Sequence, residues 1–175
     1  MSMQNMLPWG DGASPAIVPS DMTAGANGRW INVRDINDSL YIYLQLAAGG
    51  AAPTISLQQA QDSAGTGVKA LSIERLFYKV GATAISSALG SKDIFIEDTT
   101  VSESAPAATY SLTAIGGATN ESNICIRVRP QDLDHANGFG WVRVVVAAAA
   151  GKYLSALYLP CGKAQTGRLV ATPLA

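Results

Sequence analysis

Few residues in this sequence have types and spacing that suit catalysis, and the first to consider is its only histidine. His135 follows Asp132 and Asp134 in a polar segment. A serine, histidine and aspartate triad would have to use this histidine, and its serine would need the strained turn of a G-x-S-x-G motif. The sequence contains no such motif. The pattern therefore does not favour a hydrolase.

Metal binding is the next chemistry to consider. A zinc site needs about three or four converging ligands, whereas Cys125 and Cys161 are far apart in the sequence and have one histidine between them. Asp132, Asp134 and Asn137 have part of the spacing of a calcium loop, but the glycine and the closing glutamate of such a loop are absent. Aspartate and asparagine also stabilise turns, so we predict a solvated connecting loop without a metal.

Two further kinds of site depend on spacing. Residues 65–69 (GTGVK) lack both the separation of the glycines and the Lys-Ser/Thr pair of a phosphate-binding loop, so they predict a hairpin turn. Paired carboxylates for glycosidase chemistry would meet only in the folded chain, and nothing in the sequence marks such a pair. We therefore predict a protein that is not an enzyme, with no catalytic residue, no bound cofactor and no metal.

Composition limits the classes of partner. Of the 175 residues, 48% are apolar and 14% are charged, and the formal net charge at pH 7 is −1. The charged share is well below the ~25% of an average globular protein. Such a chain offers no broad basic surface for nucleic acid and no polybasic patch for a membrane, and its apolar runs are shorter than the ~20 residues of a membrane helix. We expect no nucleic-acid partner and no membrane partner.

The cellular compartment is inferred from the start of the chain and from the cysteines. The first residues show no basic segment followed by an apolar one, so we expect no cleaved secretory signal and synthesis in a cytoplasm. Cys125 lies in a strand-like segment and Cys161 in a turn signal, and cytosolic chains seldom keep structural disulfides. We therefore predict two thiols, with a single bridge between them as the alternative.

Strand periodicity dominates from Arg29 onward. Apolar and polar residues alternate in about eight or nine short segments separated by turn residues, without the amphipathic helices of a βαβ fold. Residues 84–89 are the one place where we expect a short helical turn. The pattern predicts a single all-β domain over residues 29–175, an antiparallel β-sandwich of the jelly-roll type. The candidate segments from which these eight or nine strands are expected are residues 31–33, 40–46, 54–58, 68–73, 76–80, 94–96, 110–115, 124–128, 141–146 and 153–159.

Residues 1–28 differ from the rest of the chain. They are rich in Pro, Gly, Ser, Asp and Asn, and their prolines disfavour both a continuous helix and a central strand. We therefore predict an extended N-terminal arm. Pro8 and Trp9 in this arm are candidate contacts with a neighbouring subunit, because tryptophan is a strong anchor in interfaces. A frayed terminus is the alternative interpretation.

Aromatic residues on the predicted strands are the remaining candidates for binding. If the aliphatic residues of segment 40–46 face the core, the alternation directs Tyr41 and Tyr43 to the outer face of the sheet. There, tyrosine favours contact with another protein or stacking on a sugar, unless both faces are covered within the monomer. The full set of predicted outward aromatic residues is Trp30, Tyr41, Tyr43, Phe77 and Trp141.

The order of motifs over residues 53–160 resembles that of small virion proteins of tailed bacteriophages. The resembling segments are ISLQQAQD (55–62), GTGVKAL (65–71), LFYKVG (76–81), DLD (132–134), GFGWVRV (138–144) and SALYL (155–159). The resemblance covers over half of the chain and excludes residues 1–28. It implies a β-sandwich or jelly roll that decorates or cements the phage head without enzymatic activity. It does not separate this role from that of a tail- or fibre-associated subunit.

Together these observations predict a non-enzymatic bacteriophage structural protein on the exterior of the capsid. We expect a homo-oligomer, with a trimer as its form, and the major capsid protein as a second partner. A charge-poor surface suits repeated packing, because symmetry repeats one contact many times. The candidate contact residues are Pro8, Trp9, Tyr41 and Tyr43. The alternative is a carbohydrate- or receptor-binding module of a virion tail or fibre, with Tyr41, Tyr43 or Trp141 as the stacking platform.

Overall fold

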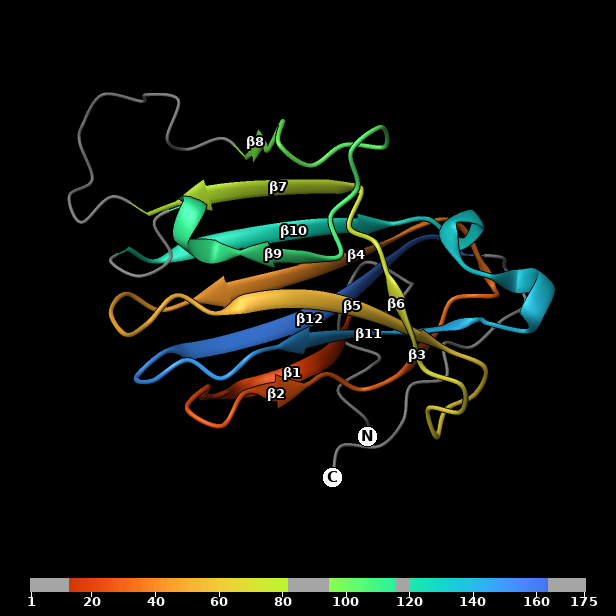
Figure 1. Cartoon of the computed structure of the whole chain (residues 1–175), viewed down its shortest axis with the longest axis horizontal. Coiled ribbons are helices and arrows are strands. Elements are labelled where there is room, and N and C mark those ends of the chain that lie inside the picture. Colours follow the sequence, from red (N-terminus) through yellow and green to blue (C-terminus); the bar gives the residue numbers. More distant parts are fainter. Residues whose placement is uncertain (1–12, 82–94, 116–119, 164–175) are drawn as a thin grey trace.

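The computed structural model describes residues 13–81, 95–115 and 120–163, which form two antiparallel β-sheets packed against each other (Figure 1). Sheet A has the strand order β1 (Ser14–Asp21), β12 (Tyr153–Lys163), β4 (Ile36–Leu46), β10 (Ser122–Val128), β7 (Arg75–Val80) and β8 (Ile96–Glu97). Sheet B has the order β2 (Ala26–Asn27), β11 (Trp141–Val146), β5 (Thr54–Ala60) and β6 (Lys69–Leu71), with β3 (Ile31–Asn32) beside β11 and β9 (Thr109–Ser111) beside β5. The predicted β-sandwich is confirmed.

The strands pair in a nested order along the chain. The first strand pairs with the last, β1 with β12, and the next pairs inward are β2 with β11, β4 with β10 and β5 with β6. Successive pairs alternate between sheet A and sheet B. This nesting is the winding of a jelly roll. Strands β7 and β8 extend sheet A beyond β10, and β9 adds to sheet B.

The hydrophobic core lies between the sheets and follows from the period-two alternation of the long strands. In β4, the buried residues from Leu40 onward are those that the alternation places inward, and β10 and β11 repeat the pattern. Full burial of an aliphatic side chain contributes roughly 1.5–3 kcal/mol relative to its exposure. The buried residues of these strands are Leu40, Ile42, Leu44, Leu46, Ile124, Ile126, Val128, Val142, Val144 and Val146.

The prediction of an extended arm over residues 1–28 is wrong for residues 14–27, which form β1 and β2 of the sandwich. Strand β1 pairs with β12 along its length, with register shifts on either side of Ile17. Pro15 and Pro19 are tolerated because β1 lies at an edge of sheet A, where a strand needs hydrogen bonds on one side only. Pro8 and Trp9 lie outside the described residues, as does the helical turn expected at residues 84–89.

The strand expected over residues 110–115 is much shorter in the structure. Only Thr109–Ser111 pairs as β9, and Leu112–Ile115 forms the 3-10 helix η3. Leu112 and Ile115 are both buried. Their spacing of three residues matches one turn of a 3-10 helix, so one face of η3 covers the core. Within the described ranges, no helix is long and apolar enough to cross a membrane.

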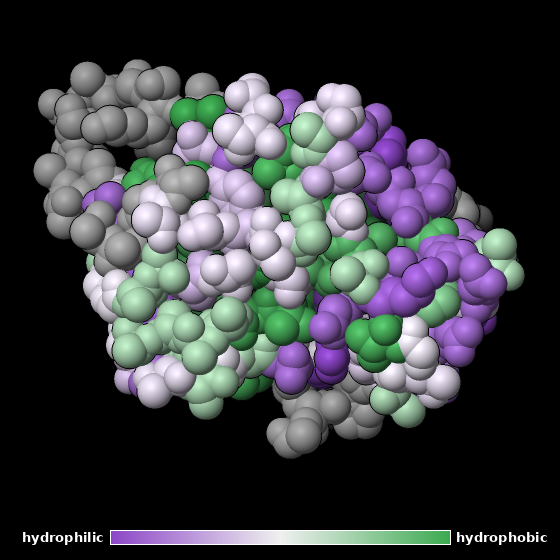
Figure 2. All heavy atoms as spheres, in the orientation of Figure 1, coloured by the Kyte–Doolittle hydropathy of each residue, from purple (hydrophilic) through white to green (hydrophobic). Residues whose placement is uncertain are grey.

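The two ends of the sandwich differ in chemistry. Figure 2 shows hydrophilic side chains gathered at the end that holds the 3-10 helices η4 (Pro130–Asp132) and η5 (His135–Asn137). At the other end, the alanine-rich β4–β5 and β11–β12 connections meet, with Ala51 N–H donating to the carbonyl of Ala150 over 2.9 Å. Beneath them the Lys152 side chain is fully buried, and its Nζ donates to the carbonyl of Ala47 over 2.9 Å.

Candidate contact surface on sheet A

The outer face of sheet A carries its side chains in rows that cross neighbouring strands. In one row, Gln45 of β4 stands between Ser155 of β12 and Asn123 of β10, and Lys79 of β7 follows Asn123. All four side chains are polar, and adjacent strands hold them roughly 4.7–4.9 Å apart. This polar row joins residues that are more than a hundred positions apart in the sequence, so only the register of the strands brings them together.

The next row is mostly apolar and contains the predicted contact residue Tyr43. Its neighbours across the strands are Leu157 on one side and Cys125 and then Phe77 on the other. The Tyr43 hydroxyl donates to Oδ1 of Asn123 over 2.7 Å, and the Phe95 ring packs against the Tyr43 ring with centroids 6.3 Å apart. Tyr43 therefore faces outward, as the alternation predicts, but it is half-buried rather than exposed.

Tyr41 lies in the row after Tyr43, next to Arg127 of β10 and Leu159 of β12. It is also half-buried, and burial raises the pKa of its hydroxyl. Trp141 belongs to β11 of the other sheet, and Trp30 directly precedes β3 of that sheet. Trp30 is buried beneath the Arg143 guanidinium, 4.5 Å from its ring centroid, and Trp141 is half-buried on β11. The structure thus divides the predicted aromatic set between two opposite faces.

The exposed apolar side chains are concentrated on sheet A. Of six large apolar residues that are exposed among the described residues, five belong to β1, β8 and β12 or directly precede β8. The sixth, Val68, lies in the turn before β6. The outward positions of sheet B are mostly polar, with Asn27, Ser56 and Gln58 among them. The five residues on sheet A are Val18, Phe95, Ile96, Tyr153 and Leu157.

A hollow of about 280 Å³ opens at one corner of this face, beside the alanine-rich end. Strands β1, β12, β4 and β10 each contribute to its wall or border it, so rigid sheet positions hold its side chains. The alternation of the sequence identifies Gln45 and Asn123 as outward polar residues, but no sequence signal shows that they share a wall. Its principal lining residues are Pro19, Gln45, Glu121, Asn123, Tyr153 and Ser155.

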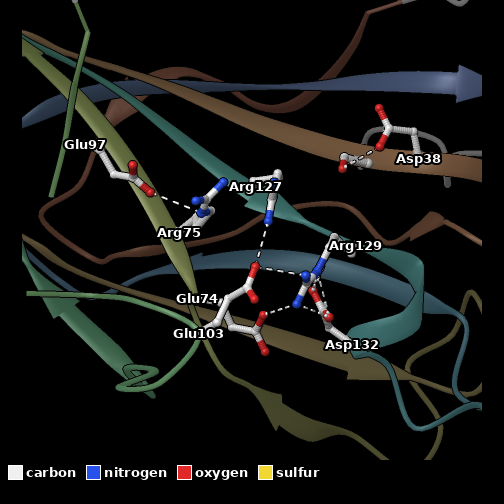
Figure 3. A network of polar contacts seen from close by, with 9 residues as sticks. Asp38, Glu74, Arg75, Glu97, Glu103, Arg127, Arg129 and Asp132 are labelled. Atoms are coloured by element: carbon white, nitrogen blue, oxygen red, sulfur yellow. Dashed lines mark hydrogen bonds and ion pairs between the residues drawn. The ribbon is translucent and has the colours of Figure 1, made fainter. Parts of the chain in front are cut away.

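A network of ion pairs borders the same face near η4 (Figure 3). Arg129 contacts the carboxylates of Glu74, Glu103 and Asp132 at 2.7–3.0 Å, and Arg127 also contacts Glu103 at 3.1 Å. Each carboxylate of this network already faces a guanidinium. These ion pairs connect residues 95–111 and η4 to sheet A and so stabilise this surface. The network does not form a pair of carboxylates suited to acid and base catalysis.

The polar segment around His135 forms the two 3-10 helices η4 and η5. Nε2 of His135 lies 2.7 Å from the carbonyl of Pro130, and the Asp134 carboxylate accepts hydrogen bonds from Lys69 and Asn137. Hydrogen bonds from Lys69 and Asn137 lower the pKa of Asp134. Asp132 instead pairs with Arg129, so the two aspartates do not converge. Among the described residues, no group of three His, Cys, Asp or Glu side chains is placed to hold a metal ion.

Cys125 and Cys161 are thiols on strands that flank β4. Burial, and to a smaller extent the neighbouring Cys161, raises the pKa of the Cys125 thiol from 9.0 to about 11. Because the thiolate is the reactive form, we expect Cys125 to react with DTNB at pH 8 about 100-fold more slowly than an ordinary cysteine. The measurement uses a Cys161→Ser variant, with the same variant in guanidinium as the control. Equal rates in the folded and unfolded protein would contradict this prediction.

Comparison with known proteins adds little to this surface. No family model matches the chain, and no curated protein matches it. Among solved structures, the chain is similar to the crystal structure of SPBc2 prophage-derived protein YomS, with 12% sequence identity and a TM-score of 0.39. The match covers 83% of this chain and 89% of that protein. This structural neighbour is thus prophage-derived, but the likeness is too loose to bear on function.

Proposed function

We propose that this protein is a non-enzymatic structural protein of a bacteriophage virion, which decorates or cements the capsid from its exterior. It assembles as a homo-oligomer, with a trimer as the expected form, and makes a second contact with the major capsid protein. The observation that carries the proposal is the concentration of exposed apolar side chains on sheet A opposite a mostly polar sheet B. A neighbouring copy is the occupant that we assign to the β8 side of this face, around Tyr43, Phe95 and Ile96.

The centre of the proposed contact is the pair formed by Tyr43 and Phe95. Phe95 is 40% exposed and Ile96 beside it is 46% exposed, although both are large apolar residues. Strand β8, which holds Ile96, is the edge of sheet A opposite β1. Exposed apolar residues on a sheet edge favour contact with another chain, whereas the prolines of β1 make that edge a poor partner for strand pairing. The Arg75–Glu97 ion pair at the same edge offers both charges to a neighbouring copy.

The oligomeric state provides the test. We expect the purified protein to sediment as a trimer at micromolar concentration and to bind purified capsids. The double variant Phe95→Ser/Ile96→Ser should raise the dissociation constant of the oligomer by at least about 30-fold, because two interface side chains lose their burial. Analytical ultracentrifugation measures the mass, and co-sedimentation with capsids measures binding to the shell.

Val68→Ser is the matched control, because Val68 is 44% exposed but lies in the turn before β6. It should assemble like the unmodified protein, and circular dichroism should show that all variants are folded. A full-length protein that stays monomeric at high micromolar concentration and does not sediment with capsids would overturn the proposal. Equal weakening by the control and the double variant would show that sheet A is not the contact surface.

A further inference from the structure

The hollow at the corner of sheet A combines polar and aromatic side chains in a way that the assembly role does not use. Gln45, Asn123 and Ser155 form its floor in one cross-strand row, and Glu121 lies at its side. Tyr153 and Pro19 belong to the apolar part of the lining, together with Leu46, Ala47 and Leu154. Tyr153 is 59% exposed, the largest exposure among the large apolar residues that stand out on the described surface. A tyrosine this exposed has little role in the core.

The floor of the hollow is suited to hydroxyl groups. A side-chain amide both donates and accepts hydrogen bonds, a serine hydroxyl does the same, and a carboxylate accepts. A sugar hydroxyl also donates and accepts, so it can pair with every one of these groups. The three floor residues lie on neighbouring strands roughly 4.7–4.9 Å apart, so the row is long enough to face hydroxyl groups of one or two sugar rings.

The site is partly ordered before a ligand arrives. The Tyr43 hydroxyl donates to Oδ1 of Asn123 over 2.7 Å and so fixes the direction of that amide. Strands β4, β10 and β12 hold the backbone of all three floor residues in a hydrogen-bonded sheet. Little side-chain freedom at Asn123 is therefore lost on binding, which favours affinity for a small polar ligand.

Charge and size restrict the class of ligand. Among the described residues that line the hollow, Glu121 is the only charged one, and the nearest cation of the polar row, Lys79, lies one strand beyond Asn123 and outside the lining. A volume of about 280 Å³ is near the lower end of the ~300–1,000 Å³ range of small-molecule pockets. The lining thus favours one or two uncharged sugar rings and disfavours a sialic or uronic acid.

We propose that this hollow binds an uncharged saccharide unit, with the Tyr153 ring against the apolar face of the sugar and with Gln45, Asn123 and Ser155 hydrogen-bonded to its hydroxyl groups. This inference goes beyond the assembly role and is independent of it. It also differs from the platform expected from the sequence, since Trp141 lies on sheet B and neither Tyr41 nor Tyr43 lines the hollow.

Saturation-transfer NMR with neutral oligosaccharides tests the proposal. The probes are maltotriose, cellotriose, N,N′,N″-triacetylchitotriose, galactotriose, mannotriose and a rhamnose disaccharide, with sialyllactose as the acidic comparison. We expect at least one neutral probe to bind with a dissociation constant near about 1 mM and sialyllactose not to bind. Tyr153→Ala and Asn123→Ala should each weaken the binding by about tenfold or more, and Tyr153→Phe should retain it.

Tyr41→Ala is the matched control, because Tyr41 is a tyrosine on the same face outside the hollow. It should bind the saccharide as the unmodified protein does, and thermal melts should show that every variant is folded. Absence of binding by all neutral probes at about 10 mM would overturn the proposal. Binding that survives Tyr153→Ala but is lost in Tyr41→Ala would overturn it as well. Phe95→Ser/Ile96→Ser should keep saccharide binding while losing assembly, so failure of one proposal is distinguishable from failure of the other.

Discussion

Deletion of residues 1–28 will unfold the sandwich, whereas deletion of residues 1–12 will leave it folded. The longer deletion removes β1, in which Ala16 and Ile17 are buried, and the fully buried Met22 that follows it. It also exposes β12, whose fully buried Ala156 and Tyr158 lie opposite β1. These residues close one side of the core, so their loss exposes much more than a terminal segment.

The expected loss can be compared with the total stability. Two large aliphatic side chains, Ile17 and Met22, contribute roughly 1.5–3 kcal/mol each on burial. The lost strand pairing and the newly exposed face of β12 add to this. A typical domain has an unfolding free energy of only about 5–15 kcal/mol, so the longer deletion removes much or all of it.

Circular dichroism and urea titration of both truncated proteins provide the measurement. The protein that lacks residues 1–12 keeps every described strand, so its urea midpoint should match that of the full chain. The protein that lacks residues 1–28 should show no cooperative transition. A cooperative transition near that of the full chain would show that β1 is dispensable and would restore the interpretation of residues 14–27 as an arm.

The shorter deletion also tests Pro8 and Trp9 as contacts between subunits. If Trp9 anchors on a neighbouring copy, its loss should cost on the order of 2 kcal/mol per contact, which corresponds to about a 30-fold rise in the dissociation constant. Sedimentation of the folded, truncated protein measures this directly. An unchanged dissociation constant would leave assembly to sheet A alone.

The alternation of apolar and polar residues predicts the long strands well, because burial of one face of the sheet produces this alternation. The pattern of residues 40–46 gives both the strand and its inward face, and residues 124–128 and 141–146 behave in the same way. Strand β1 is missed because Pro15 and Pro19 argue against a strand when its place in the sheet is unknown. Only the position at an edge makes these prolines acceptable, and that position depends on β12 at the far end of the chain.

The candidate surface is less predictable than the strands, because it depends on register between distant segments. The outward direction of Tyr41 and Tyr43 follows from the alternation, but their partial burial depends on contacts such as that of Tyr43 with Phe95. Likewise, no local feature of the sequence indicates that Ser155, Gln45 and Asn123 form one row across the strands. A search for polar residues at outward positions of predicted strands would find each member but not their adjacency.

One hydroxyl group joins the two sheets through the core. Tyr158 of β12 is fully buried, and its hydroxyl donates to the carbonyl of Arg29 over 2.7 Å and accepts from the N–H of Val144 over 3.2 Å. Strands β2 and β3 both pair with β11, and a gap in this pairing separates them. Arg29 lies in the gap, and Val144 is a β11 residue opposite the gap. The hydroxyl thus replaces a missing strand neighbour. The position of this hydroxyl also favours glycine at residue 28, because a Cβ there would lie only 3.0 Å from it.

Tyr158→Phe is therefore expected to lower the free energy of unfolding by about 2–4 kcal/mol, because it leaves the Arg29 carbonyl and the Val144 N–H buried without this partner. Urea titration measures the change. Tyr153→Phe is the matched control, because Tyr153 is on the same strand but exposed, and its expected change is below about 0.5 kcal/mol.

Burial also raises the pKa of Tyr158 above its ordinary value of 10.0, so this residue adds stability that is lost as the pH rises beyond that value. That part of the alkaline decline should disappear in Tyr158→Phe and persist in Tyr153→Phe. Equal stability of the two variants at neutral pH would refute the bridge between the sheets.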